Sequence, residues 1–242
     1  MPCVTATLTT PAGLVVGAAT SRGPARPRNA DAAAVHTFRG RVAAGVMDGT
    51  GSEQDVADLA ADAIGAAVRR AVRSTPVLGV VHAAETCCDL DADLVRPNGA
   101  VVVASSRPGQ VWRVAWAGDC GAYGWHDDGT LSRITTPHTR GEQLRREGAP
   151  EEEARRHDHQ LLMSLARVPV YGVEALEAIA PLLVLASDGL ATAPLPALAE
   201  VLREHHAQPQ ACADALVSAA RDHGSRDDIT VVVIPHPDVE RR

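Results

Sequence analysis

Apolar and polar residues alternate in short runs along much of the chain, which is the pattern of half-buried β-strands. Segment 181–186 is apolar throughout, as expected for a strand that is buried on both faces. The runs 32–38 and 41–47 are separated only by Arg39-Gly40 and are predicted to form a hairpin. Ten strands are predicted in all, at 3–10, 14–20, 32–38, 41–47, 99–105, 111–117, 123–126, 131–135, 181–186 and 229–235.

In four segments, the apolar residues recur with the spacing of an amphipathic helix. The first, 53–73, places its apolar residues on one stripe, with Ser52 as the expected N-cap. The others are 76–90, 195–206 and 209–223. Segment 139–156 is charged and only weakly helical, which indicates a mobile or surface element and not core.

Sets of mostly antiparallel strands with segregated helix pairs are typical of α+β proteins. We therefore expect two sheets packed face to face with helices on the outside. The chain has 242 residues and no linker long enough to separate domains, so 1–242 is predicted to be a single domain.

Composition narrows the function classes. Hydrophobic residues make up 45% but aromatic residues only 2%, so the core must consist mainly of Ala, Val and Leu. The net charge of -7 argues against a nucleic-acid partner. Five cysteines without a Cys-x-x-Cys predict neither a disulfide framework nor a zinc site. No apolar run approaches the ~18 residues of a membrane span, so we expect no membrane association and a cytoplasmic location.

Asp31, Asp48, Asp188 and Asp227 occupy comparable places, each close to one end of a predicted strand. Such carboxylates are held rigidly and still reach solvent. If the four converge, their charges repel one another unless a cation is present. Hard divalent cations bound by carboxylates and water are a common means of activating water against phosphate.

Five motifs extend this pattern over nearly the whole chain. They are RPRNAD at 26–31, VMDGTGS at 46–52, AWAGDCGAY at 115–123, LLVLASDGL at 182–190 and SRDDITVVV at 225–233. Each alone is weak, because Asp-Gly sequences also form ordinary turns. In this order and spacing they resemble the type 2C (PPM-type) protein phosphatases, which are metal-dependent enzymes.

The resemblance implies a four-layer αββα sandwich, a type 2C phosphatase-like catalytic domain, with two metal ions at one end of the sheets. Asp48 would bridge both ions, and the carbonyl of Gly49 would ligate one. Asp188 and Asp227 would complete the shell of the first ion. Asp119 matches the position that helps to bind a third ion in bacterial members, although it also fits an ordinary hairpin. Ligation by carboxylates and water favours Mn²⁺ or Mg²⁺.

On the substrate side, the resemblance assigns the phosphate to Arg26, with Arg28 as the alternative if the loop register shifts. A planar guanidinium suits two phosphate oxygens. Asp31 would act through metal-bound water. The implied reaction is hydrolysis of phosphoserine or phosphothreonine in proteins, and a regulator controlled by a kinase or a sigma factor is the kind of substrate expected.

Some positions depart from the family pattern. Ala30, Cys120 and Pro137 replace residues that usually contact the site or its surroundings, and Asp228 replaces an asparagine. Asp228 is expected to be a solvated neighbour of the site. Part of segment 136–180 would correspond to the family's flap. These changes keep an alternative open: a pseudophosphatase, or a regulatory binding module of the same fold with little or no turnover.

Overall fold

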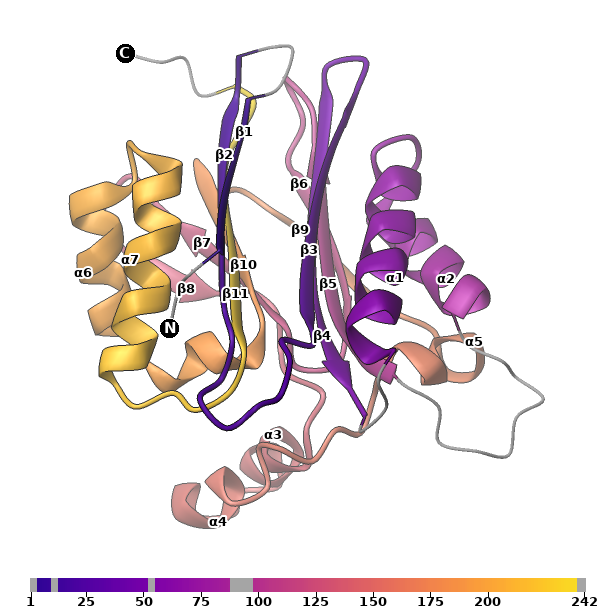
Figure 1. Cartoon of the computed structure of the whole chain (residues 1–242), viewed down its shortest axis with the longest axis vertical. Coiled ribbons are helices and arrows are strands. Elements are labelled where there is room, and N and C mark those ends of the chain that lie inside the picture. Colours follow the sequence, from indigo (N-terminus) through magenta and orange to yellow (C-terminus); the bar gives the residue numbers. More distant parts are fainter. Residues whose placement is uncertain (1–3, 10–12, 52–54, 88–97, 239–242) are drawn as a thin grey trace.

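The computed structural model describes residues 4–9, 13–51, 55–87 and 98–238. In it, two antiparallel sheets lie face to face and a pair of helices covers the outer face of each (Figure 1). The predicted αββα arrangement is thereby confirmed. No helix among the described residues is long and apolar enough to cross a membrane.

The first sheet has six strands in the order β1-β2-β11-β10-β7-β8. Its strands are β1 (Val4–Thr9), β2 (Val15–Ser21), β11 (Ile229–Pro235), β10 (Leu182–Ala186), β7 (Gly121–Trp125) and β8 (Leu131–Arg133). The central strands β11 and β10 are buried almost throughout. This burial explains why β10 is apolar throughout and why β11 contains a single polar residue, Thr230.

The second sheet has five strands in the order β3-β4-β5-β6-β9. They are β3 (Asp31–Phe38), β4 (Arg41–Thr50), β5 (Asn98–Ser106), β6 (Trp112–Ala117) and β9 (Glu174–Ala178). The hairpin of β3 and β4 turns at Arg39 and Gly40, whose φ angles of 49° and 74° are those of a two-residue hairpin turn with left-handed residues.

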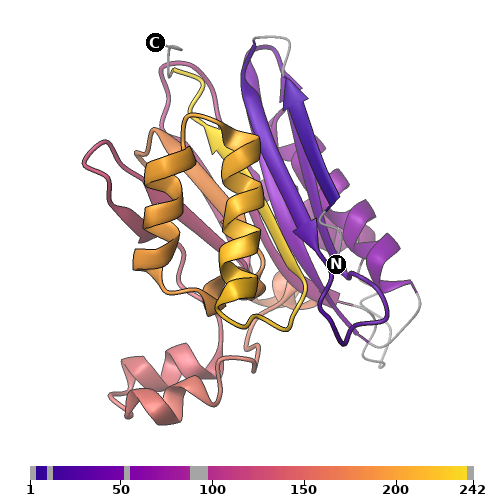
Figure 2. The ribbon, with the colours of Figure 1, turned by 60° about the vertical axis from the view of Figure 1, so that its left-hand side comes forward.

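Four long helices complete the layers. α1 (Val56–Ala71) and α2 (Pro76–Cys87) pack on the β3-to-β9 sheet, and α6 (Leu195–His205) and α7 (Pro209–Asp222) on the other (Figure 2). A third apolar cluster lies between the sheets and includes Val46, Trp112 and Leu185. In β4, Ala43 and Met47 face the helices while Val42, Ala44 and Val46 face the other sheet.

Segment 139–156 forms two short helices, α3 (Arg140–Arg146) and α4 (Glu151–Arg155), that project from one end of the sandwich (Figures 1 and 2). The surface placement agrees with the prediction. A further short helix, α5 (Val168–Tyr171), follows a single 3-10 turn, Leu165–Arg167.

Several boundaries differ from the sequence prediction. β4 continues to Thr50 and so contains Asp48, and the predicted strands omitted β9. α1 begins after Asp55, while the expected cap Ser52 lies outside the described residues. α2 ends at Cys87, and the remainder of the predicted helix is likewise not described.

Candidate metal centre

Strand ends from both sheets bring the acidic residues to one end of the sandwich. Asp31 and Asp48 are direct partners in the β3–β4 ladder. Asp188 opens the 3-10 turn Asp188–Thr192 after β10, and Asp227 lies two residues before β11. Asp119 lies in the connection between β6 and β7. The antiparallel pairing of β10 with β11 and β7 explains why these separate segments meet.

Hydrogen bonds orient the carboxyl groups of Asp31, Asp48 and Asp188. The Ser187 hydroxyl donates to Asp31 Oδ2 at 2.7 Å, and Ser187 Oγ accepts the backbone N–H of Thr230 at 2.9 Å. A hydrogen bond also joins the carboxyls of Asp48 and Asp188. The first contact ties the two sheets together across the site. Ser187 was not predicted as a site residue, although it directly precedes Asp188.

The protonation of these groups reflects burial among like charges. Burial, and then the charges of Asp228 and Asp188, raise the pKa of Asp31 to about 8. Burial and the charge of Asp188 raise the pKa of Asp119 to about 7. The pKa of Asp48 is raised well above its ordinary value by burial and by Asp31, and the pKa of Asp188 is raised by burial and by Asp227. Without added cations the cluster therefore holds protons near neutral pH.

Among the described residues, two buried carboxylate oxygens lack any hydrogen-bond partner: Asp31 Oδ1 and Asp188 Oδ1. Buried acceptors are normally satisfied, and an unsatisfied one points to a missing ion or water. The hard oxygen donors suit Mg²⁺ or Mn²⁺. Nevertheless, in the described part of the chain no three acidic, histidine or cysteine side chains are arranged to enclose an ion. The donor chemistry fits a divalent cation, and the side chains would have to adjust to surround it.

Asp227 is paired with an arginine. Arg26 Nη2 donates to Asp227 Oδ1 at 2.6 Å, and the backbone N–H of Asp228 donates to the same oxygen at 2.9 Å. The two side chains of the ion pair are 50% and 41% exposed, so the contact is open to solvent. Arg26 thus lies at the acidic cluster, while Arg28 is exposed on the same loop.

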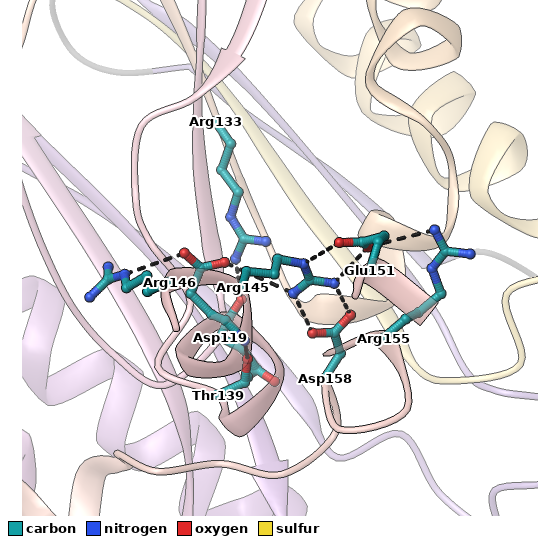
Figure 3. A network of polar contacts seen from close by, with 9 residues as sticks. Asp119, Arg133, Thr139, Arg145, Arg146, Glu151, Arg155 and Asp158 are labelled. Carbon is teal, nitrogen blue, oxygen red and sulfur yellow. Dashed lines mark hydrogen bonds and ion pairs between the residues drawn. The ribbon is translucent and has the colours of Figure 1, made fainter. Parts of the chain in front are cut away.

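Gly49 and Asp119 occupy the rim of the cluster. Gly49 is buried in β4, and its N–H donates to the Ala30 carbonyl at 3.1 Å. Asp119 is only 9% exposed, and its backbone carbonyl accepts Arg133 Nη2 at 2.6 Å (Figure 3). That burial beside Asp188 distinguishes Asp119 from an ordinary exposed hairpin residue. The metal-binding roles of both residues stay predictions.

The expectation for Asp228 is wrong. Asp228 is 4% exposed and not solvated. Its Oδ1 accepts the N–H of Gly23 at 2.7 Å and its Oδ2 accepts the N–H of Ala30 at 2.8 Å. The carboxylate is buried because backbone donors from the β2–β3 loop replace its hydration.

The α3–α4 hairpin lies beside this end of the sandwich and is closed by Arg145. Its guanidinium donates to Glu151 at 2.8 and 3.0 Å and to Asp158 at 2.6 and 2.7 Å (Figure 3). His138 precedes the hairpin, and its Nδ1 accepts the N–H of Gly118 at 3.1 Å. The hairpin is therefore anchored one residue before Asp119.

No protein-family model and no curated protein matches the sequence. Solved structures do. The PPM Ser-Thr phosphatase MsPP from Mycobacterium smegmatis, in complex with cacodylate, is 26% identical, with a TM-score of 0.75 over 91% of this chain and 97% of that one. The S. agalactiae serine/threonine phosphatase is 16% identical, with a TM-score of 0.79 over 97% and 100%.

The catalytic domain of the phosphatase PstP, in complex with two manganese ions, is 23% identical, with a TM-score of 0.71 over 97% of this chain and 99% of that one. The two matches below 25% identity concern the fold alone. Together with MsPP they account for both sheets and both helical layers. The chain therefore has the fold of the PPM-type serine/threonine phosphatases, a family of enzymes, and resembles them over nearly its whole length.

Proposed function

We propose that the protein hydrolyses phosphoserine and phosphothreonine in proteins with the help of Mn²⁺ or Mg²⁺. The observation that carries this proposal is the cluster of buried carboxyl groups at one end of the sandwich. Burial, and then like charges, raise their pKa values, and two of their oxygens have no hydrogen-bond partner. A site of this kind is unfavourable by itself and becomes favourable when divalent cations bind.

Asp48, Asp188 and Asp227 would hold two ions, with the carbonyl of Gly49 as a further ligand and Asp119 as the candidate for a third ion. When bound, such ions would lower the pKa of water and offset charge on the phosphate oxygens. The structure of the PstP domain with two manganese ions supports the proposal of a two-ion site.

Arg26 would bind the phosphate of the substrate through its planar guanidinium. Asp227 accepts from Arg26 Nη2 at 2.6 Å and so competes with the phosphate for this N–H group. Asp31 would assist proton transfer at the site, because its Oδ1 is a buried acceptor without a partner while Ser187 fixes Oδ2. The Asp31 side chain is thereby oriented before a substrate arrives.

The unusual residues leave this chemistry possible. Ala30 contributes its backbone carbonyl to Gly49, and the Cys120 thiol donates to the Ala100 carbonyl at 3.4 Å. Ala30 and Pro137 stand where the family pattern has Glu or Gln and an aspartate, but the proposed metal ligands Asp48, Asp188 and Asp227 are all present. We therefore favour turnover over a purely regulatory binding module. A cytoplasmic regulator under kinase or sigma-factor control remains the kind of phosphoprotein that we propose as substrate.

Hydrolysis of p-nitrophenyl phosphate and of a phosphoserine peptide, with and without Mn²⁺, tests the proposal. We expect Mn²⁺-dependent turnover that Asp48→Ala and Asp188→Ala each abolish. Asp62→Ala is the matched control, because Asp62 is exposed on α1. Absence of Mn²⁺-dependent turnover in the unaltered protein, with Mn²⁺ binding retained by calorimetry, would identify the regulatory module instead.

A further inference from the structure

Both oxygens of one buried carboxylate hold the loop that carries Arg26. This loop joins β2 to β3, and so links the two sheets. Gly23 near its start and Ala30 at its end donate their N–H groups to the two Asp228 oxygens, at 2.7 and 2.8 Å. Both ends of the loop are therefore fastened to the residue that precedes β11.

The same two segments touch through their backbones. A Cβ atom added to Gly23 would lie 2.5 Å from the carbonyl oxygen of Arg226 and 3.0 Å from the carbonyl carbon of Asp227. Only glycine permits this approach. The contact brings the Gly23 N–H within reach of Asp228, so the hydrogen bond and the close packing support each other.

Arg221 of α7 strengthens the junction from the other side. Its guanidinium donates to the Ser21 carbonyl at 2.8 Å and to the Asp227 carbonyl at 2.7 Å. The end of β2 and the start of β11 are thus joined by a second set of hydrogen bonds. The β2–β3 loop is therefore held at its β2 end by Arg221 and Asp228 and at its β3 end by Asp228.

We propose that Asp228 is a positioning residue that fixes the β2–β3 loop so that Arg26 faces the acidic cluster. The inference rests on the proposed function, in which Arg26 binds the substrate phosphate. Asp228 itself need not touch phosphate or metal, because its two oxygens are already occupied by Gly23 and Ala30.

A carboxylate suits this task better than the asparagine that the family pattern has at this position. A carboxylate accepts on both oxygens, whereas an amide has one acceptor oxygen and an NH₂ group that only donates. With asparagine at 228, one of the two loop N–H groups would face another donor. One end of the loop would be released, and Arg26 would spend less time at the site.

Steady-state kinetics of Asp228→Asn with p-nitrophenyl phosphate and Mn²⁺ test the proposal, because the proposal predicts that KM rises. Loss of one of the two loop hydrogen bonds to Asp228 should raise KM by about tenfold, the equivalent of one hydrogen bond to a charged group. The value of kcat should change by less than about twofold. Loss of a negative charge near the phosphate site would by itself lower KM. Asp222→Asn, an equal charge change on the exposed end of α7, should leave KM unchanged.

A double-mutant cycle shows whether Asp228 acts through Arg26. We expect KM of Arg26→Ala to be raised, and the Asp228→Asn, Arg26→Ala double variant to be no worse than Arg26→Ala. Additive effects would overturn the proposal. So would loss of Mn²⁺ binding in Asp228→Asn, because that result would make Asp228 a metal ligand.

Amide hydrogen exchange separates this proposal from the proposed function. In the unaltered protein, the Gly23 and Ala30 amides should exchange more slowly than those of the exposed Ala25 and Arg28, and Asp228→Asn should accelerate exchange in the loop alone. Slow exchange at Gly23 and Ala30 without turnover would support the role of Asp228 in holding the loop and contradict the proposed phosphatase activity. Turnover with rapid exchange at both amides would contradict the proposal that Asp228 holds the loop.

Discussion

At the scale of single residues, the acidic cluster lowers the stability of the metal-free fold and favours the binding of cations. Asp31 Oδ1 and Asp188 Oδ1 are buried without partners, and burial, and then the neighbouring carboxyl groups, raise the pKa values of Asp31 and Asp48. Unsatisfied buried acceptors and like charges both destabilise a fold. Groups arranged in this way are expected where a ligand supplies the missing interaction.

Asp48→Asn should therefore stabilise the metal-free protein. Asparagine cannot ionise, so it avoids the repulsion from Asp31 and Asp188 that Asp48 adds when it loses its proton, and it can still donate a hydrogen bond to Asp188. We expect thermal melts in EDTA at pH 8 to show a Tm higher by roughly 2–4 °C, which is about 1 kcal/mol for a chain of this size, while Mn²⁺ no longer raises Tm. Asp62→Asn should change neither value, and a lower Tm for Asp48→Asn in EDTA would contradict the argument.

Arg26→Ala should tighten Mn²⁺ binding, because Arg26 competes with cations for Asp227. A half-exposed ion pair contributes at most about 1 kcal/mol, so calorimetric titration should show a Kd lower by about two- to fivefold. The matched control is Arg113→Ala, which breaks the comparably exposed pair of Arg113 with Glu177 away from the acidic cluster. Weaker Mn²⁺ binding by Arg26→Ala would show that Arg26 instead preorganises Asp227.

The position of a site residue in the fold was predictable where the neighbouring sequence determines it. Asp48 and Asp188 each follow an apolar run, so their place near the end of a strand follows from the pattern. The burial of Asp228 does not, because its partners Gly23 and Ala30 are 205 and 198 positions away. The contact of Ser187 with Asp31 spans 156 positions and was equally invisible.

At the scale of elements, the α3–α4 hairpin is held mainly by its own charges. α3 and α4 pack against each other outside the sandwich (Figure 2). Arg145 bonds to two carboxylates at once, and its side chain is 29% exposed. A partly buried bidentate network of this kind is stronger than isolated surface ion pairs.

Arg145→Met should therefore loosen the hairpin without unfolding the domain. The methionine keeps the apolar stem and removes about 1–3 kcal/mol of charged hydrogen bonding from the hairpin. Limited proteolysis should become faster within residues 139–160, while the global Tm changes little. Arg156→Met removes only the exposed pair with Glu152 and should have no effect. An equal loss of global Tm in Arg145→Met would show that the hairpin is part of the cooperative unit.

The strand β9 illustrates the limit of pattern analysis for elements. Its sequence, Glu-Ala-Leu-Glu-Ala, contains good helix formers, and none of its residues is fully buried. It becomes a strand because it pairs with β6 at the edge of the sheet. Tertiary pairing overrides local preference here. Strands with buried apolar runs, such as β11, were located correctly for the opposite reason.

At the scale of the whole molecule, the acidic end makes stability depend on pH. The folded pKa values of Asp31 and Asp119, about 8 and about 7, lie above the ordinary value of 3.8. Between these values the folded state binds more protons than the unfolded state, so stability falls as pH rises. The loss begins above about pH 4 and is complete above about pH 8.

Tm measured in EDTA should accordingly decrease between pH 5 and pH 8, and the increase caused by Mn²⁺ should be larger at pH 8 than at pH 5. Asp31→Asn should reduce the slope in EDTA, because it removes one of the titrating groups. A Tm in EDTA that is constant or rises over this range would contradict the assignment of raised pKa values.

The layer order of the molecule was predictable from the sequence, because sets of strands and pairs of helices follow one another along the chain. The order of strands within each sheet was not. Neighbours such as β2 and β11 lie at opposite ends of the chain, and their pairing depends on long-range packing between the sheets.

The register of β3 and β4 has a practical consequence for protein engineering. Eight consecutive pairs run from Phe38–Arg41 at the turn to Asp31–Asp48 at the acidic end. At ~3.4 Å per residue, the turn lies about 24 Å from those carboxylates. Arg39 and Gly40 are exposed. A fluorophore or immobilisation tag inserted between them would extend into solvent, far enough from the carboxylates to report on the protein while leaving them undisturbed.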